Sequence, residues 1–241
     1  MLATFVLLFE PVESEVRDEV LQAVSEERLR VSGPVLTQLY ASCAPAAKPW
    51  VAASTAVSRL PPKWFMPLFD DAYRRSKDPG VQATLLGSLH YFLRTYPAHA
   101  VRYRALIRAL LRSRNQRLCV RGLGLAGQID DLQPEDLALI QKKLLARSAD
   151  HRMSALAGLA DLMYRHERLA PHVREFCRSE PLRTLIRKLQ RHDDDPFVRW
   201  GAWNCFLAWR VAFAPQSVKP GERTREYVPR ELRKYVVQRP S

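Results

Sequence analysis

The spacing of apolar residues is the feature that most constrains the fold of this chain. After about Pro34 they recur at i, i+3, i+4 and i+7 through most of the sequence, and no long segment alternates with a period of two. This pattern is typical of amphipathic helices, so we expect an all-α fold. Helices are predicted at residues 14–29, 34–43, 47–60, 61–76, 78–95, 99–113, 115–129, 134–148, 149–166, 169–192 and 195–213. Short connections predict antiparallel neighbours, and Pro181 should kink or split the helix that contains it.

Five of these helices can be aligned with one another as a repeat. The aligned segments start at Pro49, Asp78, Asn115, Ala149 and Asp195, which are separated by 29, 37, 34 and 46 positions. The eighth residue after each start is apolar: Val57, Leu86, Leu123, Ala157 and Trp203. The ninth is small or polar: Ser58, Gly87, Gly124, Gly158 and Asn204. A glycine inside a helix costs roughly 1 kcal/mol relative to alanine, so we expect a neighbouring helix to approach closely at these three glycines.

Two of the aligned segments share a short signature. The sequence DPFVR stands at residues 195–199, and DPGV at residues 78–81 is similar, with Gln82 in the arginine position. Over roughly residues 45–213 the chain resembles the HEAT-repeat family, whose units are helical hairpins of about forty residues. The other three segments keep only the outline of the signature or lack it. The resemblance implies a HEAT-like α-solenoid of about five antiparallel helical hairpins, a fold that mostly serves as a binding surface.

Composition limits the classes of protein to which the chain can belong. With 241 residues and 47% apolar content it can bury a substantial core. Its four cysteines are far apart, which favours neither a zinc site nor a disulfide framework and fits a reducing cytoplasm. The first residues do not have the pattern expected of a signal peptide, and no segment reaches the ~20 uncharged apolar residues of a membrane span. We therefore expect a cytoplasmic protein without a membrane span.

Charge is unevenly distributed along the chain, whose net charge is +13. Residues 1–30 contain seven acids and three arginines, whereas residues 79–129 contain eight arginines and no Asp, Glu or Lys. Such a basic excess favours contact with nucleic acid, anionic membrane or an acidic protein. We expect three parts, namely an acidic N-terminal cap or atypical first hairpin at 1–33, a HEAT-like repeat domain at 34–213 and a basic C-terminal tail at 214–241.

The most basic segment supplies the candidate partner-binding residues. They are Arg102, Arg104, Arg108, Arg112, Arg114, Arg117 and Arg121. Three of them follow one another at i, i+4 and i+8 and form a stripe on the helix predicted at 99–113. Because acids are absent nearby, these guanidinium groups are expected to hold carboxylates or phosphates through forked contacts. The alternative is a structural role, in which the stripe is solvated or pairs with acids of neighbouring helices.

The same segment ends in a match to Gly-x-Gly-x-x-Gly at Gly122, Gly124 and Gly127. A dinucleotide site needs a strand before the first glycine and a helix after the last one. Helices are predicted on both sides here, so we interpret these glycines as packing and helix-terminating positions. We expect no cofactor.

Other polar clusters are interpreted as structural. His192 is followed by three acids, Asp193, Asp194 and Asp195, and we expect a loop in which one of the last two caps the next helix, not a metal site. No histidine pair has metalloprotease spacing, and no serine or cysteine stands in a nucleophile motif with a legible base. We therefore expect neither metal nor catalysis.

Length, basicity and helical repeat style make the chain similar to HEAT-like DNA glycosylases, which hold damaged DNA on a basic concave face with tryptophan and aspartate. No segment matches their tryptophan-and-aspartate catalytic stretch. Trp203 belongs to an apolar column and is expected in the core, whereas Trp200 and Trp209 fall on other faces.

These patterns predict a non-enzymatic scaffold or adaptor that binds an acidic protein surface, such as a complex subunit or a toxin-immunity protein. The alternative is a nucleic-acid-binding protein or a DNA-repair enzyme of the glycosylase type. In a third hypothesis the arginines are not used, and the acidic N-terminal helices bind the partner. The oligomeric state stays open.

Overall fold

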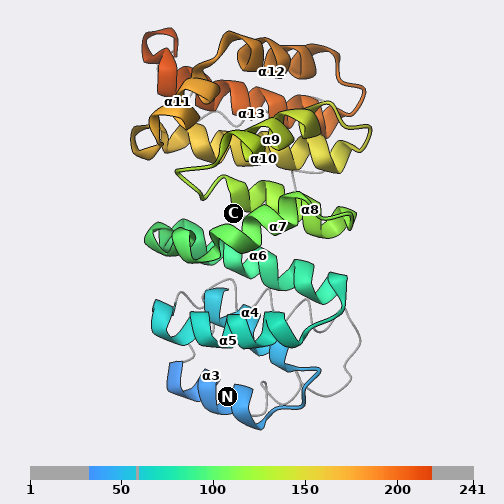
Figure 1. Ribbon diagram of the computed structural model, residues 1–241, viewed down its shortest axis with the longest axis vertical. Coiled ribbons are helices and arrows are strands. Elements are labelled where there is room, and N and C mark those ends of the chain that lie inside the picture. The colour runs from blue at the N-terminus through green and yellow to red at the C-terminus, as the bar shows by residue number, and fades with distance from the viewer. Residues whose placement is uncertain (1–32, 58–59, 219–241) are drawn as a thin grey trace, which may run out of the picture. The chain divides into compact units, whose positions relative to one another are not determined.

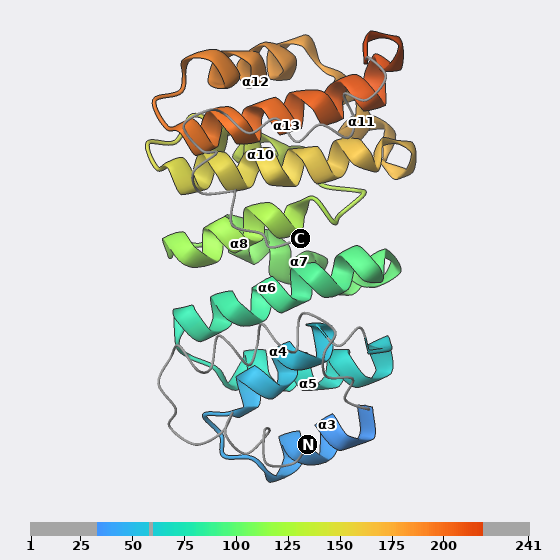
Figure 2. The same ribbon diagram turned by 180° about the vertical axis from the view of Figure 1, so that it is seen from behind.

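The structure, a computed structural model, describes residues 33–57 and 60–218, and this part of the chain is all-helical (Figures 1 and 2). The fold is therefore all-α, as the periodicity of apolar residues predicts. The helix predicted at 14–29, nearly all of the acidic segment 1–33 and the tail beyond residue 218 lie outside the described residues.

The chain divides into two compact units, Met1–His99 and Ala100–Ser241. The helices described in unit 1 are α3 (Gly33–Ser42), α4 (Lys48–Val57), α5 (Pro62–Arg75) and α6 (Pro79–Thr95). Helix α4 contacts the other three, and its short residues Val51, Ala52 and Ala56 are buried. Phe65 of α5 stacks on Phe92 of α6 with ring centroids 4.2 Å apart. Small residues on α4 and aromatic residues on its neighbours thus fill this core.

Unit 2 holds the remaining helices. They are α7 (Arg104–Leu111), α8 (Gln116–Ala126), α9 (Pro134–Leu144), α10 (Ala149–Tyr164), α11 (Pro171–Arg178), α12 (Glu180–His192) and α13 (Pro196–Phe213). Helix α10 contacts α8, α9, α11 and α13, and Figure 2 shows it between α8 and α13. Its residues Leu156, Leu159 and Leu162 are fully buried. Helix α12 packs mainly on α13 and α11, so it is covered on one side only by the described helices.

Side-chain caps fix where the aligned helices begin. The Asp78 carboxylate accepts a hydrogen bond from the backbone N–H of Val81 at 2.9 Å, and Asn115 caps α8 in the same way at 3.2 Å. Asp195 accepts from the backbone N–H groups of Phe197 and Val198. Each cap satisfies an N–H donor that the first helical turn leaves unpaired. The prediction that Asp194 or Asp195 caps the last helix is therefore confirmed for Asp195.

The predicted helix at 169–192 is split, as the proline predicts. Helix α11 ends at Arg178 and α12 begins at Glu180, with Pro181 in its first turn. The helix predicted at 99–113 is shorter than expected, because residues 97–103 form a 3-10 helix, η1, before α7. Two further 3-10 helices, η2 (His166–Arg168) and η3 (Pro215–Ser217), follow α10 and α13.

The repeat alignment is one residue out of phase in α10, and the last segment departs from it although Asp195 caps α13 as Asp78 caps α6. Leu86 and Leu123 are buried as predicted, but Ala157 is exposed and Trp203 is half-buried. The residue that precedes α10 as its N-cap is Ser148, so the helix positions are shifted by one relative to α6 and α8. The tryptophan that α13 buries is Trp209, with 8% of its surface exposed. The prediction that Trp203 lies in the core is therefore wrong.

The glycines that allow close packing also differ from the predicted column. Gly87 and Gly124 are half-buried, whereas Gly158 is buried against α8. A Cβ at Gly158 would lie 2.3 Å from the carbonyl oxygen of Leu123, and one at Gly122 would lie 2.7 Å from Cβ of Leu110 on α7. Close approaches therefore occur at Gly122 and Gly158, not along one column of three glycines.

Candidate functional site

The predicted arginine stripe on α7 is paired with acids that follow it in the sequence. Nε of Arg108 lies 2.9 Å from Oδ2 of Asp136, and Nη2 of Arg112 lies 3.0 Å from Oδ1 of the same carboxylate. Nη2 of Arg104 lies 3.3 Å from Oδ2 of Asp131. The acids come from α9 and from the loop before it. Arg104, Arg108 and Arg112 therefore have the structural role named above as the alternative, in which the stripe pairs with acids of a neighbouring element.

Asp136 is the centre of this pairing. Its side chain is fully buried in the first turn of α9, between two guanidinium groups that remain partly exposed. A buried carboxylate needs such partners, because an unpaired charge in the protein interior is strongly unfavourable. Arg108 and Arg112 therefore have a structural role in joining α7 to α9.

The other four candidate arginines divide into two groups. Arg102 lies exposed on η1 and interacts with another group. Arg114 in the loop before α8, and Arg117 and Arg121 on α8 itself, are exposed, and no acid pairs with them in the described part of the chain. We call these last three residues the α8 arginines. They are the part of the predicted site whose charge is available to a partner.

One acidic side chain, Asp150, contacts the neighbour of Arg117 on α8 without pairing with an α8 arginine. The side-chain amide of Gln116, next to Arg117 in the sequence, donates to Oγ of Ser148 at 3.0 Å and to Oδ2 of Asp150 at 3.4 Å. Asp150 is exposed at the start of α10. The surface around α8 is therefore of mixed charge.

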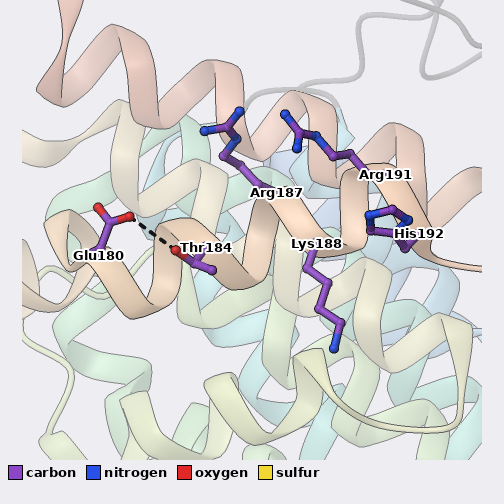
Figure 3. A pocket seen from close by; sticks show the side chains of 6 residues that line it. All are labelled: Glu180, Thr184, Arg187, Lys188, Arg191 and His192. Carbon is purple, nitrogen blue, oxygen red and sulfur yellow. Dashed lines mark hydrogen bonds between the residues drawn. The ribbon is translucent and has the colours of Figure 1, made fainter.

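A second basic surface, on α12, was not among the predicted sites. Residues Arg187, Lys188, Arg191 and His192, which we call the α12 cationic cluster, line a hollow of about 460 Å³ together with Glu180 and Thr184 (Figure 3). The sequence did contain a signal for it. Arg183, Arg187 and Arg191 follow one another at i, i+4 and i+8, the same spacing as on α7. Acids before and after this segment made it less conspicuous than the acid-free segment 79–129.

Aromatic residues of α13 hold two α12 arginines. The guanidinium carbon of Arg183 lies 5.2 Å from the ring centroid of Trp209, and that of Arg187 lies 5.5 Å from the centroid of Phe206. The two rings are nearly parallel, with centroids 6.0 Å apart. Cation–π contacts of this kind restrict a guanidinium group without neutralising its charge.

The acids after His192 stabilise the loop to α13. The carboxylate of Asp193 accepts two hydrogen bonds of 2.7 Å from Nε and Nη2 of Arg152 on α10, and Asp195 is the cap of α13. Nη1 of Arg152 also donates to the carbonyl oxygens of Ala146 and Arg147. In the described ranges, no group of three or more His, Cys, Asp or Glu residues could hold a metal ion.

The glycine motif lies within and at the end of helix α8. Gly122 and Gly124 are inside α8, and Gly127 follows its last residue. The carbonyl oxygens of Gly127 and Gln128 accept hydrogen bonds from the guanidinium group of Arg165, which also pairs with Asp130. The motif therefore packs and terminates a helix, and no strand precedes it in the described residues.

The thiols of unit 2 are buried. Cys119, Cys177 and Cys205 have no exposed surface, and burial raises the pKa of Cys177 to about 12. A thiol with so high a pKa is almost entirely protonated near neutral pH and is a poor nucleophile.

Within residues 33–57 and 60–218, no helix combines the length and the hydrophobicity that a membrane span requires. No family model matches the chain, and no curated protein matches its sequence.

Proposed function

We propose that the protein is a non-enzymatic scaffold or adaptor of HEAT-like hairpins that binds an acidic protein through the α8 arginines. The observation that carries this proposal is the difference between the two halves of the basic segment. Arg104, Arg108 and Arg112 are paired with Asp131 and Asp136. Arg114, Arg117 and Arg121 are exposed without an acid among the described residues. Three neighbouring charges that nothing in this part of the chain neutralises are available to a partner.

The chemistry of the surface favours a protein over a nucleic acid. Arginine is enriched in protein interfaces, where its forked donors bind carboxylates in two-point contacts. Nucleic-acid surfaces, in contrast, carry continuous basic tracks along the phosphate backbone. The exposed carboxylate of Asp150 near α8 interrupts such a track and would repel phosphates. A protein surface of mixed charge can accommodate Asp150 with a cation of its own.

The test is charge reversal on α8. Tagged protein is used as bait in extract of the native host, the recovered partner is purified, and its Kd is measured for the unchanged chain and for Arg117→Glu/Arg121→Glu. We expect the double variant to weaken binding by at least about tenfold, equivalent to about 1.4 kcal/mol. Arg94→Glu, an exposed residue at the end of α6, is the matched control and should bind normally.

Two results would contradict the proposal. Unchanged affinity in the double variant would move the site elsewhere, for example to the acidic segment 1–33. Binding of duplex DNA that falls steeply with added salt and is lost in the same variant would indicate phosphate contacts and support the nucleic-acid alternative.

A further inference from the structure

Most of the α12 cationic cluster is left uncovered by the described helices, with Lys188, Arg191 and His192 exposed and Arg187 half-buried. Leu182, Ile186 and Leu189 are the buried residues of α12, and the helix packs mainly on α13 and α11. In Figure 3, Arg187 and Arg191 project to the same side of α12, Lys188 projects to the other side, and His192 stands at the C-terminal end of the helix. The cluster is thus concentrated in the last two turns of one helix.

Counter-charges near the cluster are already engaged or lie beyond the helix end. Oε1 of Glu180 accepts from Nη2 of Arg183 at 2.7 Å and from Oγ1 of Thr184 at 3.2 Å. Asp193 is held by Arg152, and Asp194 is exposed after the helix has ended. No described acid pairs with Arg187, Lys188 or Arg191, which are therefore like charges at helix spacings that repel one another.

The cluster is also partly preorganised. The contact with Phe206 keeps the Arg187 guanidinium in place, and Trp209 does the same for Arg183. Nε1 of Trp209 and Nε of Arg183 are buried N–H donors without an acceptor among the described residues. Restricting a charged side chain before binding reduces the entropy lost when a ligand binds.

The dimensions of the hollow suit a small ligand. Its volume of about 460 Å³ lies within the range of roughly 300 to 1,000 Å³ typical of small-molecule sites. From Arg187 to His192 the helix rises only about 8 Å. A specific protein–DNA interface buries about 600 Å² of protein surface or more even for a single small module, whereas this cluster is confined to the end of one helix.

We propose that this hollow binds a compact soluble ligand with two or more linked phosphate groups. Two arginines and one lysine supply three permanent positive charges, and one carboxylate would neutralise only one of them. Linked phosphates supply several negative charges and closely spaced acceptor oxygens that match forked guanidinium donors. Binding would also relieve the repulsion between Arg187, Lys188 and Arg191.

Calorimetric titration with inorganic triphosphate tests the proposal, at pH 7 and low salt and without added metal. We expect saturable binding of one triphosphate per chain. Lys188→Gln/Arg191→Gln changes two exposed side chains and leaves the Arg187–Phe206 contact in place, so its thermal unfolding should be unchanged. It should weaken binding by at least about tenfold. Arg94→Gln, in unit 1, is the matched control and should bind as the unchanged chain does.

A second substitution separates charge from geometry. Arg187→Lys retains the positive charge but lacks the planar fork that Phe206 supports, so it should bind triphosphate several-fold more weakly. An Arg187→Lys variant that binds as tightly as the unchanged chain would contradict the preorganised fork.

Three other results would overturn the proposal. They are absence of saturable binding, equal affinities for orthophosphate and triphosphate, and tighter binding of single-stranded DNA that is lost in Lys188→Gln/Arg191→Gln. The second result would indicate a site for a single anion, and the third a nucleic-acid surface. Because Arg117→Glu/Arg121→Glu should leave triphosphate binding unchanged, this site and the proposed partner surface can fail independently.

Discussion

Arg108 and Arg117 lie on consecutive helices of the same basic segment, yet their environments differ. Arg108 donates to a carboxylate that is fully buried, whereas Arg117 is exposed without an acid among the described residues. The charge of Arg108 is needed inside the protein because Asp136 would otherwise be a buried, unpaired anion. An arginine in this sequence can thus stabilise the fold or be available for binding, depending on the residue that faces it.

Asp136→Asn should reveal the structural role of this pairing. The substitution removes the negative charge between Arg108 and Arg112, and we expect it to lower the free energy of unfolding by about 2 to 4 kcal/mol. Urea unfolding monitored by circular dichroism measures this loss. Glu135→Gln, at an exposed neighbouring position of α9, should cost less than about 1 kcal/mol. Equal losses in the two variants would show that the buried pair contributes nothing to stability.

Helix positions were predictable from the sequence because period, caps and prolines are local signals. Helix α6 was predicted at 78–95 and is found at Pro79–Thr95, and the proline after Glu180 separates α11 from α12 as expected. The phase of α10 was predicted one residue late. Its N-cap is Ser148, a residue type favoured at this position, whereas the alignment placed the equivalent position at Ala149.

The candidate site was less predictable than the helices because ion pairs join residues from different elements. Arg104, Arg108 and Arg112 on α7 have the same spacing as Arg183, Arg187 and Arg191 on α12. The first set is paired with Asp131 and Asp136, whereas in the second set Glu180 pairs with Arg183 and no other described acid pairs with these arginines. Spacing reveals that charges share a helix face, but only the packing of α7 against α9 shows what lies opposite.

Gly158→Ala should separate two helices that approach at their backbones. The new Cβ would lie 2.3 Å from the carbonyl oxygen of Leu123, which belongs to the α8 backbone and cannot move alone. We expect a loss of about 2 kcal/mol or more, despite the roughly 1 kcal/mol by which alanine favours a helix. The comparison is Gly201→Ala, whose Cβ would meet Sδ of Met153, also at 2.3 Å.

Methionine is flexible and can adopt another rotamer, so Gly201→Ala should be tolerated where Gly158→Ala is not. Thermal unfolding of the two variants gives the comparison. Similar midpoints would mean that α8 and α10 adjust to the extra methyl group, and the close approach would then have little energetic importance.

At the scale of the whole molecule, both basic surfaces and three of the four cysteines belong to the second compact unit. The α8 arginines and the α12 cationic cluster are carried by helices whose apolar sides face α10 and α13 respectively. Stability of this unit is therefore a condition for either binding activity. Its buried thiols give a way to change that stability without touching an arginine.

Burial of these thiols should make the chain less stable at alkaline pH. Burial raises the pKa of Cys177 to about 12 and raises the pKa of Cys205 as well, whereas both thiols ionise near pH 9 in the unfolded chain. The unfolded state therefore loses these protons first. The contribution of the protonated thiols to the free energy of unfolding is complete below about pH 9. It is lost as the pH rises toward 12, by up to about 1.4 kcal/mol per pH unit for each thiol. Urea unfolding at pH 8, 9 and 10 measures this slope, which should be shallower in Cys177→Ala/Cys205→Ala. Burial also raises the pKa of Cys43, but that thiol is only half-buried, so Cys43→Ala should change the slope less than the double variant does. Identical slopes in all three proteins would mean that the folded chain accommodates the two thiolates without loss of stability.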